Sequence, residues 1–180
     1  MIRFLDLSFS IIGIIILFPL LVLILLIIWL ENGSPLFLQL RVGKNKKPFK
    51  VVKFRTMKLD TPSLGSHLVD SSSITKIGLF LRSSKIDELP QLWNVFKGEM
   101  SFVGPRPCLY NQKDLIKERE ARTVYDIRPG ITGLAQINKI NMSTPKLLAE
   151  TDLKMKETMN IKNYFRYIIL SIFRNYNRKL

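Results

Sequence analysis

Two adjacent carboxylates, Asp87 and Glu88, precede a helical pattern in the middle of the chain. Because Pro90 is tolerated only in a first helical turn, the sequence predicts a helix that begins at about Asp87 and ends near Gly98. A helix N-terminus favours an ionised carboxylate and a bound phosphate. Asp87 is therefore a candidate nucleophile, and the alternative is an ordinary helix cap. The predicted apolar stripe consists of Leu89, Leu92, Trp93 and Phe96.

Three cationic side chains elsewhere in the chain stand in patterns that constrain how they project. Lys53 and Arg55 stand two residues apart in a predicted strand and so project from one face, which is also typical of a solvated strand. Arg106 lies between two prolines, which restrict the backbone that carries its guanidinium. Such rigidity suits a phosphate clamp, and the alternative is a structural turn with a surface arginine.

Composition limits the classes of protein that these residues could serve. The 180 residues, 47% of them hydrophobic, suffice for one domain and a membrane segment. With 28 basic and 14 acidic residues, the chain suits an anionic membrane surface, a phosphorylated substrate or nucleic acid. The single Cys108 and single His67 exclude an internal disulfide framework, a thiolate-rich metal site and a multi-histidine zinc site. Carboxylates remain the better candidates for catalysis, in a reducing, cytoplasmic setting.

An uncharged apolar segment covers residues 7–29. A helix of this length crosses a hydrocarbon core about 30 Å thick. Pro19 predicts a kink near its middle, because proline removes a backbone donor and clashes with the preceding turn. The segment is either a kinked spanning helix or a re-entrant hairpin with both ends in the cytoplasm. A cleaved signal peptide is a further alternative, although no small-residue cleavage site follows and Trp29 suits an interfacial exit.

The other predicted elements surround these candidates. The C-terminal stretch predicts a basic amphipathic helix, which either lies in the lipid headgroup region or packs on the domain core. Its predicted apolar face consists of Ile161, Tyr164, Phe165, Ile168, Ile169, Ile172, Phe173 and Tyr176. The remaining predictions are a β-hairpin of residues 36–40 and 49–57, a polar loop over 58–73, a polar helix over 111–125 and a stiff scaffold turn over 128–133.

Four ordered motifs carry a family resemblance: residues 53–57 (KFRTM), 87–91 (DELPQ), 104–107 (GPRP) and 129–133 (PGITG). Together they resemble the monotopic phosphoglycosyl transferases, the bacterial sugar transferase family, over nearly the whole chain. The resemblance implies an α+β fold, with a mainly helical catalytic domain, a small β-hairpin and amphipathic surface helices. It also implies that residues 1–35 form a re-entrant membrane helix broken at Pro19, and that residues 36–180 lie on the cytoplasmic face of the bacterial inner membrane.

The resemblance further implies a ping-pong mechanism. Asp87 attacks a UDP-sugar, UMP leaves, and undecaprenyl phosphate then takes the phosphosugar from Asp87, in the first membrane step of a glycoconjugate pathway. Mg²⁺ near Asp87 is the expected cofactor, and Glu88 either helps to bind it or positions the acceptor phosphate. Membrane lipids, but not nucleic acid, are the other expected partners. The expected phosphate ligands are Lys53, Arg82 and Arg106, with Arg55 as a further candidate.

Some positions depart from the family pattern. The membrane break reads Phe18-Pro19 in place of Ser-Pro, and Lys139-Ile140 stands where Gly-Arg is common, so that one expected cation is missing or shifted to Lys139. Asp152 lacks the tyrosine often found near it. Other functions to distinguish are a non-covalent phosphosugar transferase, a membrane phosphohydrolase and a basic, non-enzymatic membrane adaptor.

Overall fold

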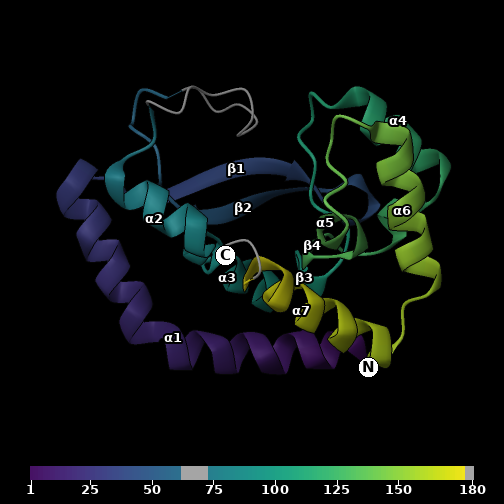
Figure 1. Cartoon of the computed structure of the whole chain (residues 1–180), viewed down its shortest axis with the longest axis horizontal. Helices are drawn as coiled ribbons and strands as arrows, with labels where there is room; N and C mark the ends of the chain where they lie inside the picture. The colour runs from purple at the N-terminus through teal and green to yellow at the C-terminus, as the bar shows by residue number, and fades with distance from the viewer. Residues whose placement is uncertain (62–72, 177–180) are drawn as a thin grey trace.

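The computed structural model describes residues 1–61 and 73–176. The described chain is mostly helical, as the sequence predicts, and has two small sheets, of which one is the predicted hairpin (Figure 1). His67 and most of the predicted loop over 58–73 lie outside the described residues. In chain order the elements are α1 (Ile2–Asn32), β1 (Leu36–Val42), η1 (Lys44–Lys46), β2 (Pro48–Phe54), α2 (Lys76–Ser84), η3 (Ile86–Glu88), α3 (Gln91–Lys97), β3 (Ser101–Val103), α4 (Lys113–Ala121), η4 (Val124–Asp126), β4 (Gly130–Thr132), α5 (Leu134–Ile137), α6 (Pro145–Glu157) and α7 (Ile161–Tyr176).

The apolar segment forms one helix, α1, with Pro19 inside it. Figure 1 shows α1 bent into two arms, one along α3 and α7 and the other beside α2. The first arm approaches α3 so closely that a Cβ on Gly13 would lie 3.3 Å from Leu92, whereas Ile24 and Ile28 pack in the cluster that includes Leu81 of α2. Pro19 lies between these contacts, and a proline inside a helix explains the bend.

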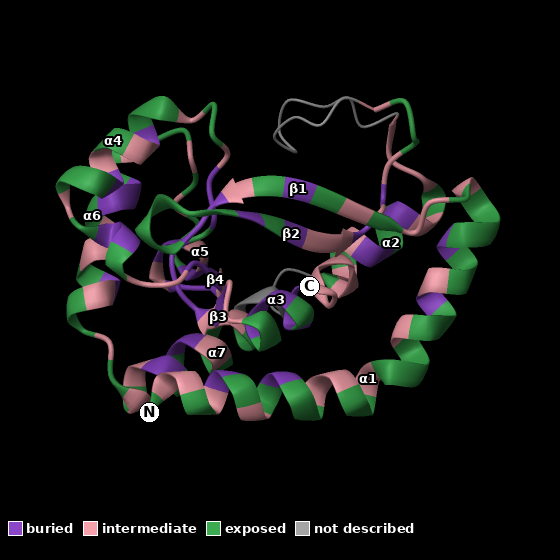
Figure 2. Ribbon diagram, turned by 180° about the vertical axis from the view of Figure 1, so that it is seen from behind, coloured by how far each residue is buried: buried purple, intermediate pink, exposed green. Residues whose placement is uncertain are grey.

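Most of α1 faces outward, as the exposed and intermediate colours of Figure 2 show. In its most apolar 18-residue window only 11% of the residues are buried, and the helix is long and apolar enough to cross a membrane. A soluble fold would bury such a surface, so this exposure suits a lipid environment. Gly33 ends the helix in the left-handed conformation, with φ of 72°, and donates its N–H to Trp29 O at 2.8 Å.

Polar residues fix the first turns of α1 to the rest of the molecule. Asp6 Oδ1 accepts hydrogen bonds from Ser101 Oγ at 3.0 Å, the Phe102 N–H at 3.1 Å and the Tyr164 hydroxyl at 2.9 Å. Arg3 donates to two carbonyls in the last turn of α3, at 2.6 and 2.8 Å, where a cation also complements the helix dipole. Both ends of α1 are therefore held against the same body, because β1 follows directly after Gly33.

The predicted β-hairpin is present. Strands β1 and β2 pair antiparallel from Leu36 opposite Phe54 to Val42 opposite Pro48, and η1 forms the connection. The second strand ends at Phe54, earlier than the predicted residue 57, and Met57 instead forms an isolated bridge with Ile74.

A parallel pair, β3 and β4, corrects the prediction that residues 128–133 form only a stiff turn. The two chains pass so closely that a Cβ on Gly130 would lie 2.0 Å from the Gly104 nitrogen. Gly104 N–H donates to Thr132 O at 2.8 Å, and Gly130 N–H donates to Pro105 O at 2.9 Å. Only glycine permits this approach, which fixes the backbone on which Arg106 stands.

Helices α4 and α6 also hold the backbone that carries Arg106. The predicted polar helix is shorter than expected, since α4 ends at Ala121 and η4 follows. Arg119 of α4 forms a buried ion pair with Asp152 of α6, 2.7 Å from Nη2 to Oδ2. Its Nη1 donates to the Arg106 carbonyl at 2.9 Å. The pair thus connects α4 and α6 to the proline-bounded segment.

The last helix, α7, packs on the domain core, which is one of the two predicted roles of the C-terminal segment. Tyr164 and Tyr167 are buried and pack with residues of β3 and the start of α1. Ile172 and Phe173, each 64% exposed, face away from the core with Ile169. One face of α7 therefore packs on the domain, and a second apolar face is left open.

Candidate active site

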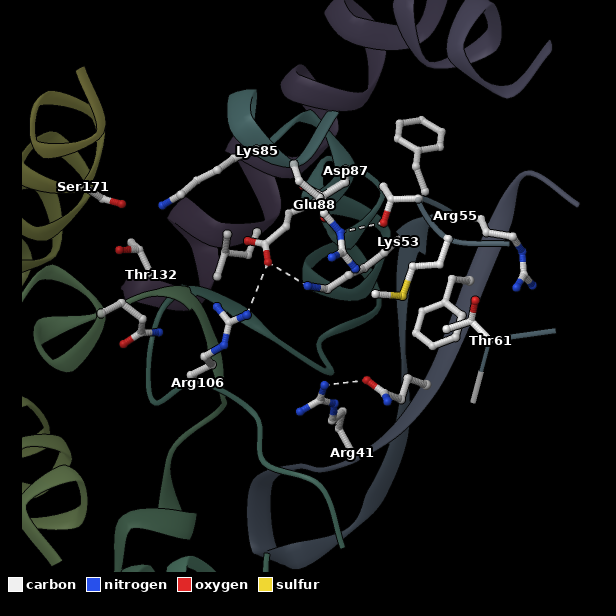
Figure 3. Close-up of a pocket in the computed structure, with 18 of the residues that line it drawn as sticks. Arg41, Lys53, Arg55, Thr61, Lys85, Asp87, Glu88, Arg106, Thr132 and Ser171 are labelled. Atoms are coloured by element: carbon white, nitrogen blue, oxygen red, sulfur yellow. Dashed lines mark hydrogen bonds and ion pairs between the residues drawn. The ribbon is translucent and has the colours of Figure 1, made fainter. Parts of the chain in front are cut away.

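A pocket of about 320 Å³ lies between the hairpin, the α2–η3 connection, the segment after β3, and β4 with α5 (Figure 3). Asp87, Glu88 and all four predicted cations line it. Pro19 of α1 is not among the lining residues. The described cations around the pocket are Arg41, Lys53, Arg55, Lys58, Arg82, Lys85, Arg106 and Lys139. Eight cations beside two carboxylates create a strong preference for a polyanion.

The carboxylates lie in η3, a 3₁₀ turn, and α3 begins only at Gln91. This corrects the prediction of an α-helix from about Asp87, because the bonds from Glu88 N to Lys85 O and from Leu89 N to Ile86 O span three residues. Pro90 has no N–H to continue an α-helical ladder. Gly98 ends α3 as predicted. Of the predicted apolar stripe, Leu92 is buried, whereas Trp93 is 51% exposed.

Glu88 binds the cations of the pocket. Its Oε1 lies 2.7 Å from Lys53 Nζ and 3.6 Å from Arg106 Nη2. Burial raises the pKa of Glu88, but Lys53 and Arg106 outweigh it and bring the pKa to about 2. Glu88 therefore stays ionised at neutral pH and holds two predicted phosphate ligands from different elements side by side.

Asp87 has a different environment. Burial raises its pKa, the charge of Glu88 adds to the rise, and Lys53, Arg82 and Arg106 oppose it. This direction is opposite to the sequence-based expectation of a site that favours the ionised form. Within residues 1–61 and 73–176, the Asp87 carboxylate has neither a side-chain hydrogen bond nor an ion pair within 4.0 Å. It lines the pocket, and no described side chain is paired with the oxygens that would attack a substrate.

Two other predicted cations are held by hydrogen bonds at the wall of the pocket. Arg82 of α2 donates from Nε to Thr56 Oγ1 at 2.8 Å, beside Asp87. Arg55 donates to the carbonyls of Ser34 and Leu36, at 2.9 and 3.2 Å, and lies over the Phe37 ring. Arg55 thus stabilises the connection between α1 and β1 at the edge of the pocket, and Figure 3 shows it directed away from Glu88.

Sequence reasoning missed several polar residues of the pocket. Arg41 donates to Pro107 O at 3.0 Å and to Gln39, and burial together with Arg106 lowers its pKa to about 10. Gln39 and Arg41 alternate along β1, so the period-two pattern that selected Lys53 could have found them. Thr132 and Gln136, also in the wall, carry no such signal because β4 and α5 are too short for a periodic pattern.

The carboxylates of the pocket are the candidate ligands of the predicted Mg²⁺. Among the described residues there is no group of three or more His, Cys, Asp or Glu side chains that could hold a metal. Asp87 and Glu88 are the carboxylates in the described wall of the pocket. Mg²⁺ in phosphate-transfer sites is usually held by one or two carboxylates together with substrate phosphates. The pair therefore fits a metal that arrives with, or is completed by, a phosphorylated substrate.

The chain thus combines a cationic pocket that contains a carboxylate pair with an outward-facing helix long and apolar enough to cross a membrane. The chain belongs to the bacterial sugar transferase family, whose model matches residues 1–178.

Several curated relatives share large parts of the sequence. The "Uncharacterized sugar transferase EpsL" of Bacillus subtilis is 48% identical over 64% of the chain and 57% of that protein. "Galactosyl transferase CpsE" of Streptococcus agalactiae is 33% identical over 94% of the chain and 41% of that protein. "UDP-glucose:undecaprenyl-phosphate glucose-1-phosphate transferase" of Caulobacter vibrioides is 43% identical over 70% of the chain and 49% of that protein. The chain therefore spans about half the length of these relatives.

Proposed function

We propose that the protein transfers a phosphosugar from a UDP-sugar to undecaprenyl phosphate through a covalent intermediate on Asp87. The observation that carries the proposal is the Asp87 carboxylate, which has no side-chain partner among the described residues and lies at the centre of a cationic pocket beside the apolar helix α1. Such a pocket suits a diphosphate donor, and the helix brings the site to a lipid acceptor. The names of the relatives, which include UDP-glucose and undecaprenyl phosphate, support the same reaction.

In the first step, an oxygen of Asp87 attacks the β-phosphorus of the donor. A bond forms between this oxygen and phosphorus, the bond from phosphorus to the bridging oxygen breaks, and UMP leaves with the electron pair. Lys53, Arg82 and Arg106 stabilise the charge that spreads over the phosphate oxygens. Asp87 and Glu88 would hold Mg²⁺, which would supply neutralisation of the phosphate charge.

In the second step, a phosphate oxygen of undecaprenyl phosphate attacks the phosphorus bound to Asp87. The bond to Asp87 breaks, the carboxylate is restored and the product is an undecaprenyl diphosphate sugar. UMP leaves before the acceptor reacts, which gives ping-pong kinetics. Glu88 contributes by keeping Lys53 and Arg106 together, 2.7 and 3.6 Å from its Oε1, while the phosphates change.

We further propose that α1 enters and leaves the same leaflet, with the pocket on the cytoplasmic face of the inner membrane. Arg3 and Asp6 fix the start of α1 to the body, and β1 continues from its end, which supports a re-entrant helix over a spanning one. Pro19 lies between the two arms. The basic residues after Arg41 suit the cytoplasmic side. Periplasmic labelling of a cysteine placed near Met1 in intact cells would contradict this topology.

The open apolar faces of the body support this placement. Phe80 of α2, Trp93 of α3 and Phe173 of α7 are exposed, and each belongs to an element near α1. Aromatic and aliphatic side chains at such positions suit the lipid headgroup boundary, with the cations of the chain facing anionic lipid.

The nucleophile is tested by intact-mass measurement of purified protein incubated with UDP-sugars and Mg²⁺ without lipid. Wild type should gain one phosphosugar and release UMP, whereas Asp87→Asn should show neither. Asp126→Asn is the matched control, because Asp126 is an exposed carboxylate paired with Lys156 outside the pocket. An Asp87→Asn protein that still transfers phosphosugar to lipid would support a non-covalent transferase.

Two further outcomes separate the other candidate functions. A membrane phosphohydrolase would release UMP and free sugar phosphate without lipid product. A non-enzymatic adaptor would release no UMP from any donor, and the carboxylate pair at the centre of the cationic pocket argues against it because such a protein has no need for one.

A further inference from the structure

The pocket has two chemically different ends on either side of its charged centre. Figure 3 shows Glu88, Lys53 and Arg106 in the middle, with Thr132 on one side and Arg55 on the other. We call the two sides the hairpin end and the β4–α5 end. The hairpin end consists of Phe37, Gln39, Arg41, Phe54, Met57, Lys58 and Thr61, and the β4–α5 end consists of Ile131, Thr132, Gln136, Ile137, Lys139 and the neighbouring Ser171.

The β4–α5 end contains two buried polar atoms without partners. Thr132 is only 8% exposed, and its Oγ1 has no hydrogen-bond partner in the described part of the chain. The same is true of Gln136 Oε1. Leaving such atoms unpaired is unfavourable, so a buried pair in the wall of a pocket points to a ligand that pairs them.

The backbone holds these side chains in place. The Thr132 carbonyl accepts the Gly104 N–H at 2.8 Å, and Gln136 Nε2 donates to the Gly104 carbonyl at 3.4 Å. Gly133 leaves no room for a side chain between them, since a Cβ there would lie 2.9 Å from Gln136 Oε1. The two unpaired oxygens are therefore positioned before any ligand binds.

The types of these atoms define the ligand group. Gln136 Oε1 can only accept a hydrogen bond, so it disfavours a phosphate oxygen and requires an O–H or N–H donor. The Thr132 hydroxyl can donate or accept. A hydroxyl group of a ligand satisfies both, because it donates to one oxygen while it accepts from the other.

The two ends of the pocket also indicate how a nucleotide sugar lies in it. The diphosphate of a nucleotide sugar stands between its base and its sugar, and the charged centre of the pocket stands between its two ends. Phe37 gives the hairpin end an aromatic ring that suits a flat base, and no aromatic residue is among the described residues of the β4–α5 end. The hydroxyl-rich sugar therefore fits the β4–α5 end.

We propose that Thr132 and Gln136 form the sugar subsite and bind a hydroxyl group of the transferred sugar, and so determine which donors are used. This inference rests on the proposed function and specifies its donor site. Gln136 Oε1 accepts the hydrogen of the sugar hydroxyl, and the Thr132 hydroxyl donates to its oxygen.

The test measures kcat/KM for UMP release in the presence of undecaprenyl phosphate. The donors are UDP-glucose, UDP-galactose, their N-acetylamino forms, and the 2-, 3-, 4- and 6-deoxy analogues of the best substrate among them. Thr132→Val keeps the shape of the side chain and removes a hydroxyl without a partner, so folding should be unaffected. It should lower kcat/KM for the best donor about tenfold and abolish discrimination against one deoxy analogue. Inhibition by UMP should stay unchanged, because UMP lacks the sugar.

Two variants complete the design. Gln136→Met should lose discrimination at the same sugar hydroxyl as Thr132→Val. Thr61→Val makes the same chemical change at the hairpin end and should leave discrimination among the sugars unaltered. If Thr132→Val loses kcat/KM equally for all deoxy analogues, or is inhibited more weakly by UMP, the sugar subsite is wrong. UMP release by wild type would still support the proposed function in that case. No UMP release by wild type from any donor would instead refute the proposed function itself.

Discussion

Removing Arg119 should destabilise the protein strongly, although Arg119 lies outside the pocket. The side chains of Arg119 and Asp152 are 2% and 0% exposed, and Nε and Nη2 of Arg119 both donate to Asp152 Oδ2, at 3.0 and 2.7 Å. Arg119→Met leaves Asp152 buried without its cation, and loss of one partner of such a pair costs about 3–5 kcal/mol. For a chain of this size the expected decrease in Tm is roughly 6–20 °C.

The loss should depend on pH. Burial raises the pKa of Asp152 and Arg119 opposes the rise, so the variant should raise it further. A carboxyl whose pKa is higher in the folded than in the unfolded state stabilises the fold at low pH. That stabilisation is lost as pH rises through the folded-state pKa, by about 1.4 kcal/mol for each unit of difference between the two pKa values. Arg119→Met should therefore be least defective below the ordinary aspartate range and most defective at neutral pH.

A double variant separates stability from activity. Arg119→Met with Asp152→Leu replaces the ion pair by apolar side chains of similar size, which is often neutral, so Tm should return to within a few degrees of wild type. The hydrogen bond from Arg119 to the Arg106 carbonyl is still lost. Because this bond holds the backbone of a predicted phosphate ligand, kcat/KM for UMP release should remain about tenfold below wild type.

Thermal unfolding in detergent micelles and UMP release measure the two effects. Glu120→Gln is the control, since Glu120 pairs with Lys46 at the surface and its removal should cost less than about 1 kcal/mol. If Arg119→Met is as mild as this control, the buried pair does not stabilise the fold. If the double variant regains wild-type activity, Arg119 does not position Arg106.

Three other predictions concern the site and the membrane helix. The acid limb of the pH profile of kcat/KM should follow Asp87, whose pKa is raised, because activity falls as Asp87 is protonated. The charge of Glu88 contributes to the rise, so Glu88→Gln should move this limb to lower pH. A limb that does not move would count against Asp87 as the titrating group. Lys139 has φ of 59°, a conformation that glycine adopts more easily, so Lys139→Gly should stabilise the fold by up to about 1 kcal/mol. The same variant removes a cation from the pocket and should raise KM for the donor. An unchanged KM would show that Lys139 does not bind the donor. Tyr164→Phe should lower the free energy of unfolding by about 1 kcal/mol. Asp6→Asn should lower it more, since Asp6 accepts three hydrogen bonds. Equal losses in thermal unfolding would mean that the other two hydrogen bonds do not contribute to stability.

Local sequence patterns were sufficient for several elements of the fold. Alternation along the chain predicted the hairpin, the uncharged run predicted α1, and Gly98 marked the end of α3. Each depends on contacts between residues near in sequence, which periodicity and backbone preferences report directly. The order of the motifs likewise predicted the family, which the match over residues 1–178 confirms.

The family resemblance also predicted which charges meet, but not how each is held. Lys53, Arg82, Arg106 and the two carboxylates all line one pocket. The pairing of Glu88 with Lys53, and the opposite directions in which the pKa values of Glu88 and Asp87 move, depend on burial and distance. No spacing in the sequence specifies these quantities.

Asp87 and Glu88 show most clearly which properties are local and which depend on the tertiary structure. By itself, the sequence determined that Asp87 and Glu88 precede a helix limited by Pro90, since proline chemistry is local. Only the tertiary structure decided that Glu88 is bound by cations from β2 and the segment after β3, while the Asp87 carboxylate has no such ion pair within the described part of the chain. It also decided that Thr132 and Gln136 share their pocket, because β4 reaches it only through the close passage of Gly104 and Gly130. Such contacts join distant segments, and packing alone specifies them.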